Sequence, residues 1–396
     1  MNWETLKDKK IQQFIKDHAE HDPFSLGLKA KQFPDFPMRL ITEQIQARQK
    51  AKSKLPSWYQ TEGIILPPLL SMEQCSSEAT ARYKAGVIKG DRLLDLTGGS
   101  AVDTYYIGQN FQSVVYTEIW EELFQRSQHN LQILGANHIQ CHFGDGVEYL
   151  KTQAEFDVIF LDPYRRDEQK NKVFLLSDCL PNVIELEALL LEKGKDVWIK
   201  ASPMLDIKGA LQQLPQIQEV HIIAVQNDCK EVLFRMNKES RKDIQFFTSN
   251  LLPNGKSQAL SYSQIEETAA VAPLSEPLQY LYEPNVAIMK AGGFKIVAER
   301  YQLQKLHPHS HLYTSEKLVP GFPGRSFLIK GVEAVNKKII KKYCKDGKAN
   351  LAIRNFPSTV ADLRKKLKLK EGGENYLFAT TLKDDKKVLI FTKKAL

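Results

Sequence analysis

The chain of 396 residues is predicted to contain an α/β domain built on a mostly parallel sheet. Short apolar runs alternate with helical stretches such as 119–134 and 173–191, which is the pattern of βαβ units. Asn227-Asp228-Cys229 is too short a link for a parallel crossover, so the last two runs should form an antiparallel hairpin. The expected sheet has seven strands, the last antiparallel: 92–96, 113–117, 138–143, 157–161, 196–200, 219–226 and 230–236.

Composition divides the chain into four regions. Residues 1–72 have helical spacing of apolar residues and are expected to form an N-terminal helical domain. Residues 73–242 hold the predicted sheet, and residues 243–325 are expected to form a small mixed connector domain with ordered proline and glycine turns. Residues 326–396 have the pattern of a small α+β module, with strands near 326–330, 350–354, 375–381 and 387–392 and helices near 332–344 and 358–367.

Positive charge is concentrated in the C-terminal module. Residues 326–396 hold 18 lysines and arginines and 7 acids, a net charge of +11, whereas the rest of the chain carries −3. A confined excess of this kind is typical of a module that binds a polyanion, and nucleic acid is the leading interpretation. A solvated lysine-rich surface that serves solubility is the alternative.

Several classes of protein are excluded by composition. No apolar run approaches the length of about 18 residues that a membrane span needs. The charged start lacks the apolar core of a signal peptide. The five cysteines are scattered without a CxxC pair, which argues against a disulfide framework or a zinc ribbon. We therefore expect a reducing, cytoplasmic setting, no membrane partner and no metal.

The first predicted strand ends in a polar, glycine-containing loop. Asp95 closes the strand and is followed by Thr97, Gly98, Gly99 and, further on, Asp103. Neither the G-x-G-x-x-G pattern for dinucleotides nor a Gly-Lys-Ser/Thr P-loop is present, so a cofactor without phosphates is favoured. S-adenosyl-L-methionine fits, because Asp95 suits its ammonium group and the glycines clear space for the sulfonium chain.

Acids also close the next two strands. Glu118 is placed to accept hydrogen bonds from both ribose hydroxyls, and Asp145 to accept one from an adenine amino group, with Phe143 beside the ring. Any one acid at a strand end is weak evidence, since such acids often cap the following helix. Acids at four successive strand ends, the fourth being Asp162, favour a cofactor site.

The fourth strand ends in Asp162-Pro163-Tyr164-Arg165-Arg166, which we expect opposite the transferred methyl group. Asp162 would orient the nucleophile or accept its proton, and Pro163 would hold the loop rigid. Arg165 and Arg166 would bind a substrate phosphate, or else form internal ion pairs with Asp162 or Asp167.

Two other groups of residues carry less weight. Cys229 is the only cysteine expected on the active face, and a buried structural role is favoured for it, so a nitrogen or oxygen is the expected methyl acceptor rather than pyrimidine C5. His307, His309 and His311 alternate beside a proline, where a structural or surface role is favoured over metal binding.

The strand-end motifs resemble class I S-adenosylmethionine-dependent methyltransferases, whose Rossmann-like sheet has six parallel strands and one antiparallel strand at the end, as predicted here. Three further segments resemble a Bacteroidetes-type family of RNA methyltransferases with a C-terminal THUMP-like domain: 73–78, 282–292 and 354–357. The sequence departs from the usual pattern in having Ala101 where a glycine is common, and Asp-Pro-Tyr-Arg in the reaction loop, which weakens the expectation of exocyclic-amine methylation. The resemblance implies structured RNA, tRNA or rRNA, as the partner.

Three functions remain open on these grounds. The first is a methyltransferase that modifies structured RNA gripped by the basic module. The second is a methyltransferase that acts on a small molecule or a protein. The third is a non-catalytic RNA-binding factor with a methyltransferase fold, against which the retained strand-end acids argue.

Overall fold

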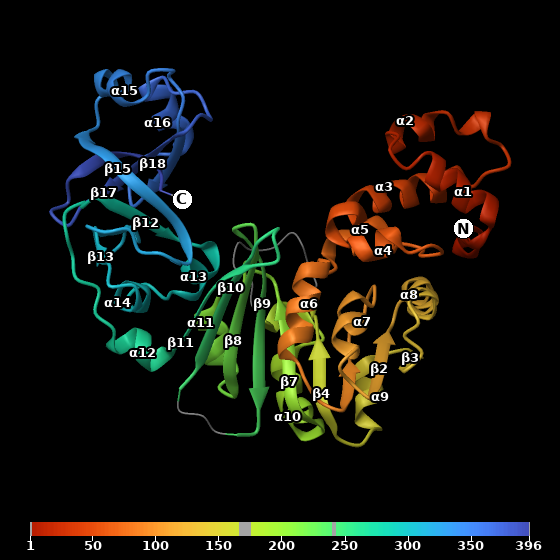
Figure 1. Ribbon diagram of the computed structural model, residues 1–396. Helices are drawn as coiled ribbons and strands as arrows, with labels where there is room; N and C mark the ends of the chain where they lie inside the picture. Colours follow the sequence, from red (N-terminus) through yellow and green to blue (C-terminus); the bar gives the residue numbers. More distant parts are fainter. Residues whose placement is uncertain (1, 166–175, 240–242, 396) are drawn as a thin grey trace. The chain divides into compact units, whose positions relative to one another are not determined.

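Figure 1 shows the computed structural model, which describes residues 2–165, 176–239 and 243–395. The chain forms two compact units. The first comprises Met1–Gln218 with Lys230–Ser240, and the second comprises Glu219–Cys229 with Arg241–Leu396. No helix within the described ranges combines the length and apolar character needed to cross a membrane.

The N-terminal region is helical, as predicted. Asp8 and Asp22 cap the first two helices with their carboxylates, and prolines open α2 and α4 at positions where an amide hydrogen is not needed. Ile41, Ile45 and Trp58 are fully buried in the cores that these helices enclose. The helices are α1 (Lys9–Asp17), α2 (Pro23–Leu28), α3 (Met38–Lys54), α4 (Pro56–Gln60), α5 (Leu69–Gln74) and α6 (Glu78–Val87), preceded by the 3-10 turn η1 (Trp3–Lys7).

All seven predicted strands are present in one sheet, which confirms the predicted Rossmann-like class. The strand order is β11-β10-β8-β9-β7-β4-β1-β2-β3, and β9 runs antiparallel to β7. The strands are β1 (Arg92–Asp95), β2 (Ser113–Glu118), β3 (Ile139–Phe143), β4 (Phe156–Leu161), β7 (Gly194–Ala201), β8 (Ile217–Val225), β9 (Asp228–Asn237), β10 (Gln245–Leu251) and β11 (Ser257–Ser263).

The sheet differs from the expectation in having nine strands rather than seven. The two additional strands, β10 and β11, come from the region expected to be a connector, and β10 pairs in parallel with β8. Thr248 and Asn250 are buried polar residues of β10 whose side chains bond to Leu260 O and Gln258 of β11. Because these strands bury polar side chains, their sequences lack the apolar signal of a central strand.

The helices between the strands are α7 (Val102–Gly108), α8 (Glu121–Ile133), α9 (Gly146–Lys151), α10 (Val183–Lys193) and α11 (Ile207–Gln213). Of the helix predicted at 173–191, residues 173–175 lie outside the described residues, and within the described residues α10 begins at Val183. Asn182 caps it, and the residues before Pro181 form a short strand β6 (Cys179–Leu180) that pairs with β5 (Tyr164–Arg165). Proline disfavours helical torsions in the residue before it, and Pro181 therefore explains why the helix starts later than predicted.

The second sheet has seven strands in the order β13-β14-β12-β15-β18-β17-β16. It includes the four strands predicted in the C-terminal module, and it also takes in strands from residues before 325. The strands are β12 (Tyr280–Pro284), β13 (Gln304–Lys305), β14 (Tyr313–Ser315), β15 (Gly324–Ala334), β16 (Asn350–Arg354), β17 (Asn375–Thr381) and β18 (Lys387–Lys394). The helices of this part are α12 (Gln264–Ala269), α13 (Val286–Ala291), α14 (Ile296–Arg300), α15 (Lys337–Tyr343) and α16 (Val360–Leu367).

A buried arginine joins the N-terminal helices to α8. The side chain of Arg126 is 1% exposed, and its guanidinium lies 3.2 Å from Glu43 of α3, 2.5 Å from Glu122 and 3.1 Å from the carbonyl oxygen of Leu66. Nearby, the side chain of Asn130 bonds to both the amide and the carbonyl of Ile65. The chain between α4 and α5 is therefore held against α8 by side-chain hydrogen bonds.

We expect Arg126→Ala to lower the free energy of unfolding by about 2 to 3 kcal/mol, less than a fully buried pair would lose because both acid partners are partly exposed. Urea denaturation of the full chain measures this. Arg39→Ala, at an exposed position of α3, is the matched control and should change stability by less than about 0.5 kcal/mol. Equal losses for the two variants would contradict the role given to Arg126.

Candidate active site

The two polar strand ends singled out in the sequence meet in the structure. β1 and β4 are parallel neighbours, with Asp95 opposite Phe160. Beyond the strands, the amide of Asp162 donates a hydrogen bond of 2.6 Å to the hydroxyl of Thr97. The loop after β1 and the loop after β4 are thus joined directly, as expected for the carboxyl edge of a parallel sheet.

The glycine loop is held tightly on several sides. A Cβ at Gly98 would lie 2.1 Å from a ring carbon of Tyr116, so only glycine fits there. The amide of Gly99 donates to Glu118 at 3.0 Å, and its carbonyl accepts from the hydroxyls of Tyr116 at 2.6 Å and Ser127 at 2.9 Å. The path of this loop is therefore fixed by the second strand and by α8.

Ala101 occupies a left-handed conformation with φ of 59° at the start of α7. L-amino acids other than asparagine and aspartate rarely adopt it, because Cβ approaches the following carbonyl. Glycine has no Cβ and adopts this conformation freely, which accounts for its frequent occurrence at this position in the class I methyltransferases that the sequence resembles.

Asp95 is a buried acid without a cationic partner among the described residues. Its side chain accepts hydrogen bonds from the amide of Thr97 at 3.1 Å and from the hydroxyl of Thr104 at 2.6 Å. The residue is 1% exposed, and burial raises the pKa of its carboxyl to about 7. A buried acid in this state would be stabilised by an incoming cation.

Glu118 and Asp145 differ in their surroundings. Glu118 is buried and accepts from Gly99 N and, at 2.7 Å, from Trp120 N, and burial raises the pKa of its carboxyl. Asp145 is exposed and caps α9 through the amide of Val147 at 2.7 Å, which is the alternative role considered for strand-end acids.

Exposed apolar side chains lie at the ends of β2 and β3. Ile119 is 54% exposed, Trp120 64% and Phe143 50%, and the ring of Phe143 lies 5.5 Å from that of Phe124. Large apolar groups seldom remain this exposed together without a ligand or partner. They flank the two acids expected at the ribose and the adenine.

The reaction loop is partly open to solvent. The side chain of Asp162 is 38% exposed and that of Tyr164 projects outward at 51% exposure, whereas Pro163 is buried. Tyr164 and Arg165 form β5 through their backbone. The side chain of Arg165, and the whole of Arg166 and Asp167, lie outside the described residues.

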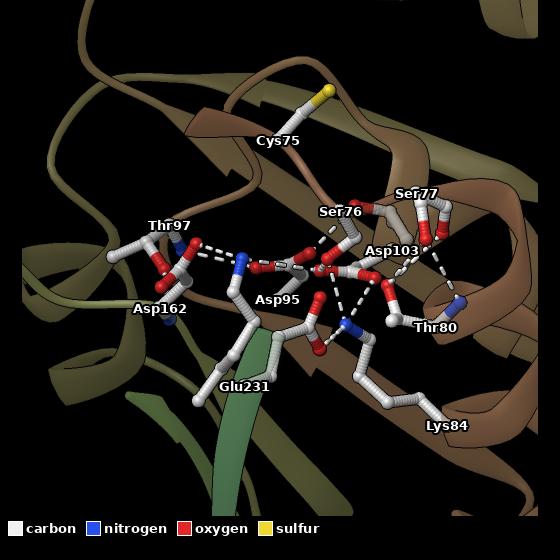
Figure 2. A network of polar contacts seen from close by, with 12 residues as sticks. Cys75, Ser76, Ser77, Thr80, Lys84, Asp95, Thr97, Asp103, Asp162 and Glu231 are labelled. Atoms are coloured by element: carbon white, nitrogen blue, oxygen red, sulfur yellow. Dashed lines mark hydrogen bonds and ion pairs between the residues drawn. The ribbon is translucent and has the colours of Figure 1, made fainter. Parts of the chain in front are cut away.

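A buried ion network underlies the site, and sequence reasoning missed most of it (Figure 2). Lys84 of α6 is fully buried and lies 2.9 Å from Asp103 and 2.5 Å from Glu231 of β9. Lys200 at the end of β7 contacts Asp162 and lies 3.6 Å from Asp103. The network links one carboxylate of the reaction loop to two helices, α6 and α7, and to two strands, β7 and β9.

Asp103, which the sequence places among the cofactor-binding residues, is a member of this network. Its carboxylate accepts from Ser76 at 2.7 Å and faces both lysines. Burial raises the pKa of Asp103, but attraction by Lys84 and Lys200 outweighs burial and holds the pKa below its usual value. Burial likewise lowers the pKa of Lys200, yet its acid neighbours, Asp162 first, raise the pKa above the ordinary range. Both groups are therefore charged at neutral pH.

One member of the network could have been found from sequence. Val197-Trp198-Ile199-Lys200 places a lysine at a strand end, just where the acids of the other strands lie. The pair of Lys84 and Glu231 joins residues 147 apart in the chain, and no local pattern reveals it.

His307 and His311 have separate protein partners, and His309 contacts His307. His307 contacts Asn355 at 3.0 Å and Asp385 at 3.3 Å, and the ring of His311 stacks on Phe294 at 3.7 Å. Among the described residues, no group of three or more His, Cys, Asp or Glu side chains is arranged to hold a metal ion.

We expect Lys84→Met to lower the free energy of unfolding by about 3 to 5 kcal/mol, because it leaves Asp103 and Glu231 buried without this cation. Thermal and urea denaturation measure the loss. Lys89→Met, at an exposed position just after the same helix, is the control and should cost little. A small effect at Lys84 would show that Lys200 alone neutralises the network.

Family models match three parts of the chain. Residues 72–163 match the model for protein-L-isoaspartate(D-aspartate) O-methyltransferase, residues 280–323 a ferredoxin-like domain, and residues 324–394 a THUMP domain-like model. The first match covers β1 to β4 and the strand-end acids.

Three known proteins illustrate the relationship. A crystal structure described as a "putative methyltransferase" from Porphyromonas gingivalis W83 has 33% identity and a TM-score of 0.87, covering 98% of this chain and 99% of its own. An uncharacterized S-adenosylmethionine-dependent methyltransferase of Mycobacterium tuberculosis is 21% identical over 76% of this chain and 80% of its own length. A protein-L-isoaspartate O-methyltransferase of Fervidobacterium nodosum is 35% identical, over 22% of this chain and 46% of its own.

The match to the Porphyromonas protein spans nearly the whole chain, and so it includes both the region of the strand-end acids and the C-terminal module. The chain therefore belongs to the family of class I S-adenosylmethionine-dependent methyltransferases that carry a C-terminal THUMP-like domain.

Proposed function

We propose that this enzyme methylates a nitrogen or oxygen atom of structured RNA, tRNA or rRNA, in the cytoplasm. The observation that carries the proposal is the concentration of charge: the THUMP-like region from 326 to 396 has a net charge of +11 on a chain that is otherwise slightly acidic. An excess confined to one module matches an RNA backbone better than a small neutral substrate.

A protein substrate is the second candidate, since residues 72–163 match the model of an enzyme that methylates protein carboxyl groups. That match ends at Pro163, so it covers the cofactor half of the domain and only the first two residues of the reaction loop, Asp162 and Pro163. Family membership argues against the non-catalytic alternative.

Asp95, Thr97, Gly98 and Gly99 are the residues that we propose for the methionine end of S-adenosyl-L-methionine. The buried carboxylate of Asp95 would pair with the ammonium group, which supplies the cation that Asp95 lacks among the described residues. The glycine loop would bring backbone close to the sulfonium. Asp103 would contribute indirectly, by anchoring the start of α7 to the ion network.

The other half of the cofactor would lie across the ends of β2 and β3. Glu118 would accept from the ribose hydroxyls, and Asp145 from the adenine amino group. The exposed rings of Trp120 and Phe143 would cover the base. The cofactor supplies an activated methyl group, and these residues bind and orient it.

At the reaction end, Asp162, Pro163, Tyr164 and Arg165 are the proposed substrate-facing residues. Lys200 holds the Asp162 carboxylate in one orientation, so Asp162 would align a nucleophilic N–H or O–H group by accepting its hydrogen bond. The thiol of Cys75 lies near the network, but it donates to the carbonyl of Met72 and burial raises its pKa, which does not favour a thiolate nucleophile.

The substrate class is tested by incubating the protein with methyl-labelled cofactor and, separately, total bacterial RNA, protein and metabolites. We expect label in the RNA fraction, with loss of labelling in Asp162→Ala. Label confined to the protein fraction would establish the second candidate and refute RNA as substrate.

The raised pKa of Asp95 predicts how cofactor affinity depends on pH. The ammonium group needs the carboxylate, so binding of S-adenosylhomocysteine should weaken by up to about tenfold for each pH unit below 7 and should level off above it. Isothermal titration calorimetry from about pH 5 to pH 8 measures this.

Asp95→Asn should bind S-adenosylhomocysteine weakly at every pH, and its affinity should no longer depend on pH. Asp157→Asn, at the opposite end of β4, is the control and should keep the pH dependence. A wild-type profile that is flat through pH 7 would refute the pairing of Asp95 with the ammonium group.

A further inference from the structure

Three cationic side chains project from one face of the second sheet. Arg325 of β15 is paired in register with Glu283 of β12, and Phe327 is paired with Lys394 of β18. Paired residues, and residues two apart on a strand, share a face of a sheet. Arg325, Lys394 and Glu283 therefore lie on the same side, and Arg354 at the end of β16 reaches the same carboxylate.

Glu283 organises the two arginines. Its side chain is only 4% exposed, and it accepts from Arg325 Nε at 2.8 Å and lies 2.5 Å from Arg354. β12 and β16 are separated by three strands in the sheet, so this carboxylate draws together side chains from distant strands. One acid holds two arginines that are each about 40% exposed, which leaves a net positive charge and two pre-oriented guanidinium groups.

A cavity of about 320 Å³ opens beside this cluster. Its lining includes Gln258, Ser326, Arg325 and Lys394, together with the backbone at Gly324. A side chain could not replace Gly324, since a Cβ there would lie 2.1 Å from the carbonyl oxygen of Glu283. Val319 and Phe322 are also part of the lining, so the cavity combines charged and polar groups with an apolar wall.

Lys394 gives this cavity a positive charge that no acid neutralises. Its ammonium lies 5.6 Å from the centre of the Tyr376 ring and contacts no acidic side chain in the described part of the chain. Arg325 uses Nε and Nη2 for Glu283, which leaves donors at Nη1 available.

We propose that this cavity, which is lined by Arg325 and Lys394 and joined to Arg354 through Glu283, binds a backbone phosphate of the RNA. The proposal rests on RNA being the substrate and locates where the second unit grips it. The Nη1 donors of Arg325, held in place because Nε and Nη2 bind Glu283, lie beside a lysine without an acid partner and can donate to the oxygens of a phosphodiester. An acidic protein segment would use the same charges, and the test below separates it from RNA.

The test compares two neighbouring lysines of β18 in the full-length protein. Lys394 lines the cavity, whereas Lys393 is paired with Leu328, points to the opposite face and contacts Glu374 at 3.2 Å. Fluorescence anisotropy with labelled bulk bacterial tRNA gives the Kd of wild type, Lys394→Gln, Lys393→Gln and Arg354→Gln at several salt concentrations.

We expect Lys394→Gln and Arg354→Gln each to raise the Kd for tRNA by roughly 3- to 10-fold. Each should also lower the slope of log Kd against log salt concentration by about 1. Lys393→Gln should change neither the Kd nor the slope. Melting temperatures within a few degrees of wild type show that the variants are folded.

Equal affinity of all four proteins for tRNA would overturn the cavity as the binding site while leaving RNA as substrate. Failure of the wild type to bind tRNA or ribosomal RNA would refute both the proposed substrate and this site. If Lys394→Gln and Arg354→Gln bound an acidic peptide more weakly than the wild type but bound RNA equally well, the cavity would be assigned to a protein partner instead.

Discussion

The candidate site depends on the neutralisation of buried charge beneath it. Lys84 and Lys200 are set among Asp103, Asp162 and Glu231, and each lysine faces two of these acids. Removing charges from water is costly, so such a cluster persists only where every member has partners. Its members come from α6, α7, β7, β9 and the loop after β4, and the geometry of the reaction loop therefore depends on the packing of the whole domain.

The same constraint separates two kinds of acid at the sheet edge. Asp103 is compensated by protein cations and behaves as part of the scaffold. Asp95 is just as buried but is surrounded by neutral donors, which leaves it with a raised pKa. A carboxylate that the protein itself does not neutralise is where a cationic ligand gains most from binding. The difference lies in the partners of the two residues, since both are aspartates, one before and one after the same short loop.

Local patterns carried the prediction of the sheet, of the helical N-terminal region and of the loops after β1 and β4, because each depends on residues close together in the chain. The ion pair between Lys84 and Glu231 could not be predicted from local patterns, because the two residues lie far apart in the sequence. β10 and β11 were missed because they bury polar side chains such as Thr248. The delayed start of α10 follows from Pro181, which helical periodicity alone does not take into account.

The long strand β15 makes the two C-terminal segments matched by family models structurally dependent on each other. The ferredoxin-like match ends at residue 323 and the THUMP-like match begins at 324, yet β12 from the former pairs along its length with β15 from the latter. Loss of the second segment alone would expose the backbone of β12 and remove Arg325, a partner of Glu283. The two matched segments therefore share one sheet, and neither is a self-contained structural unit.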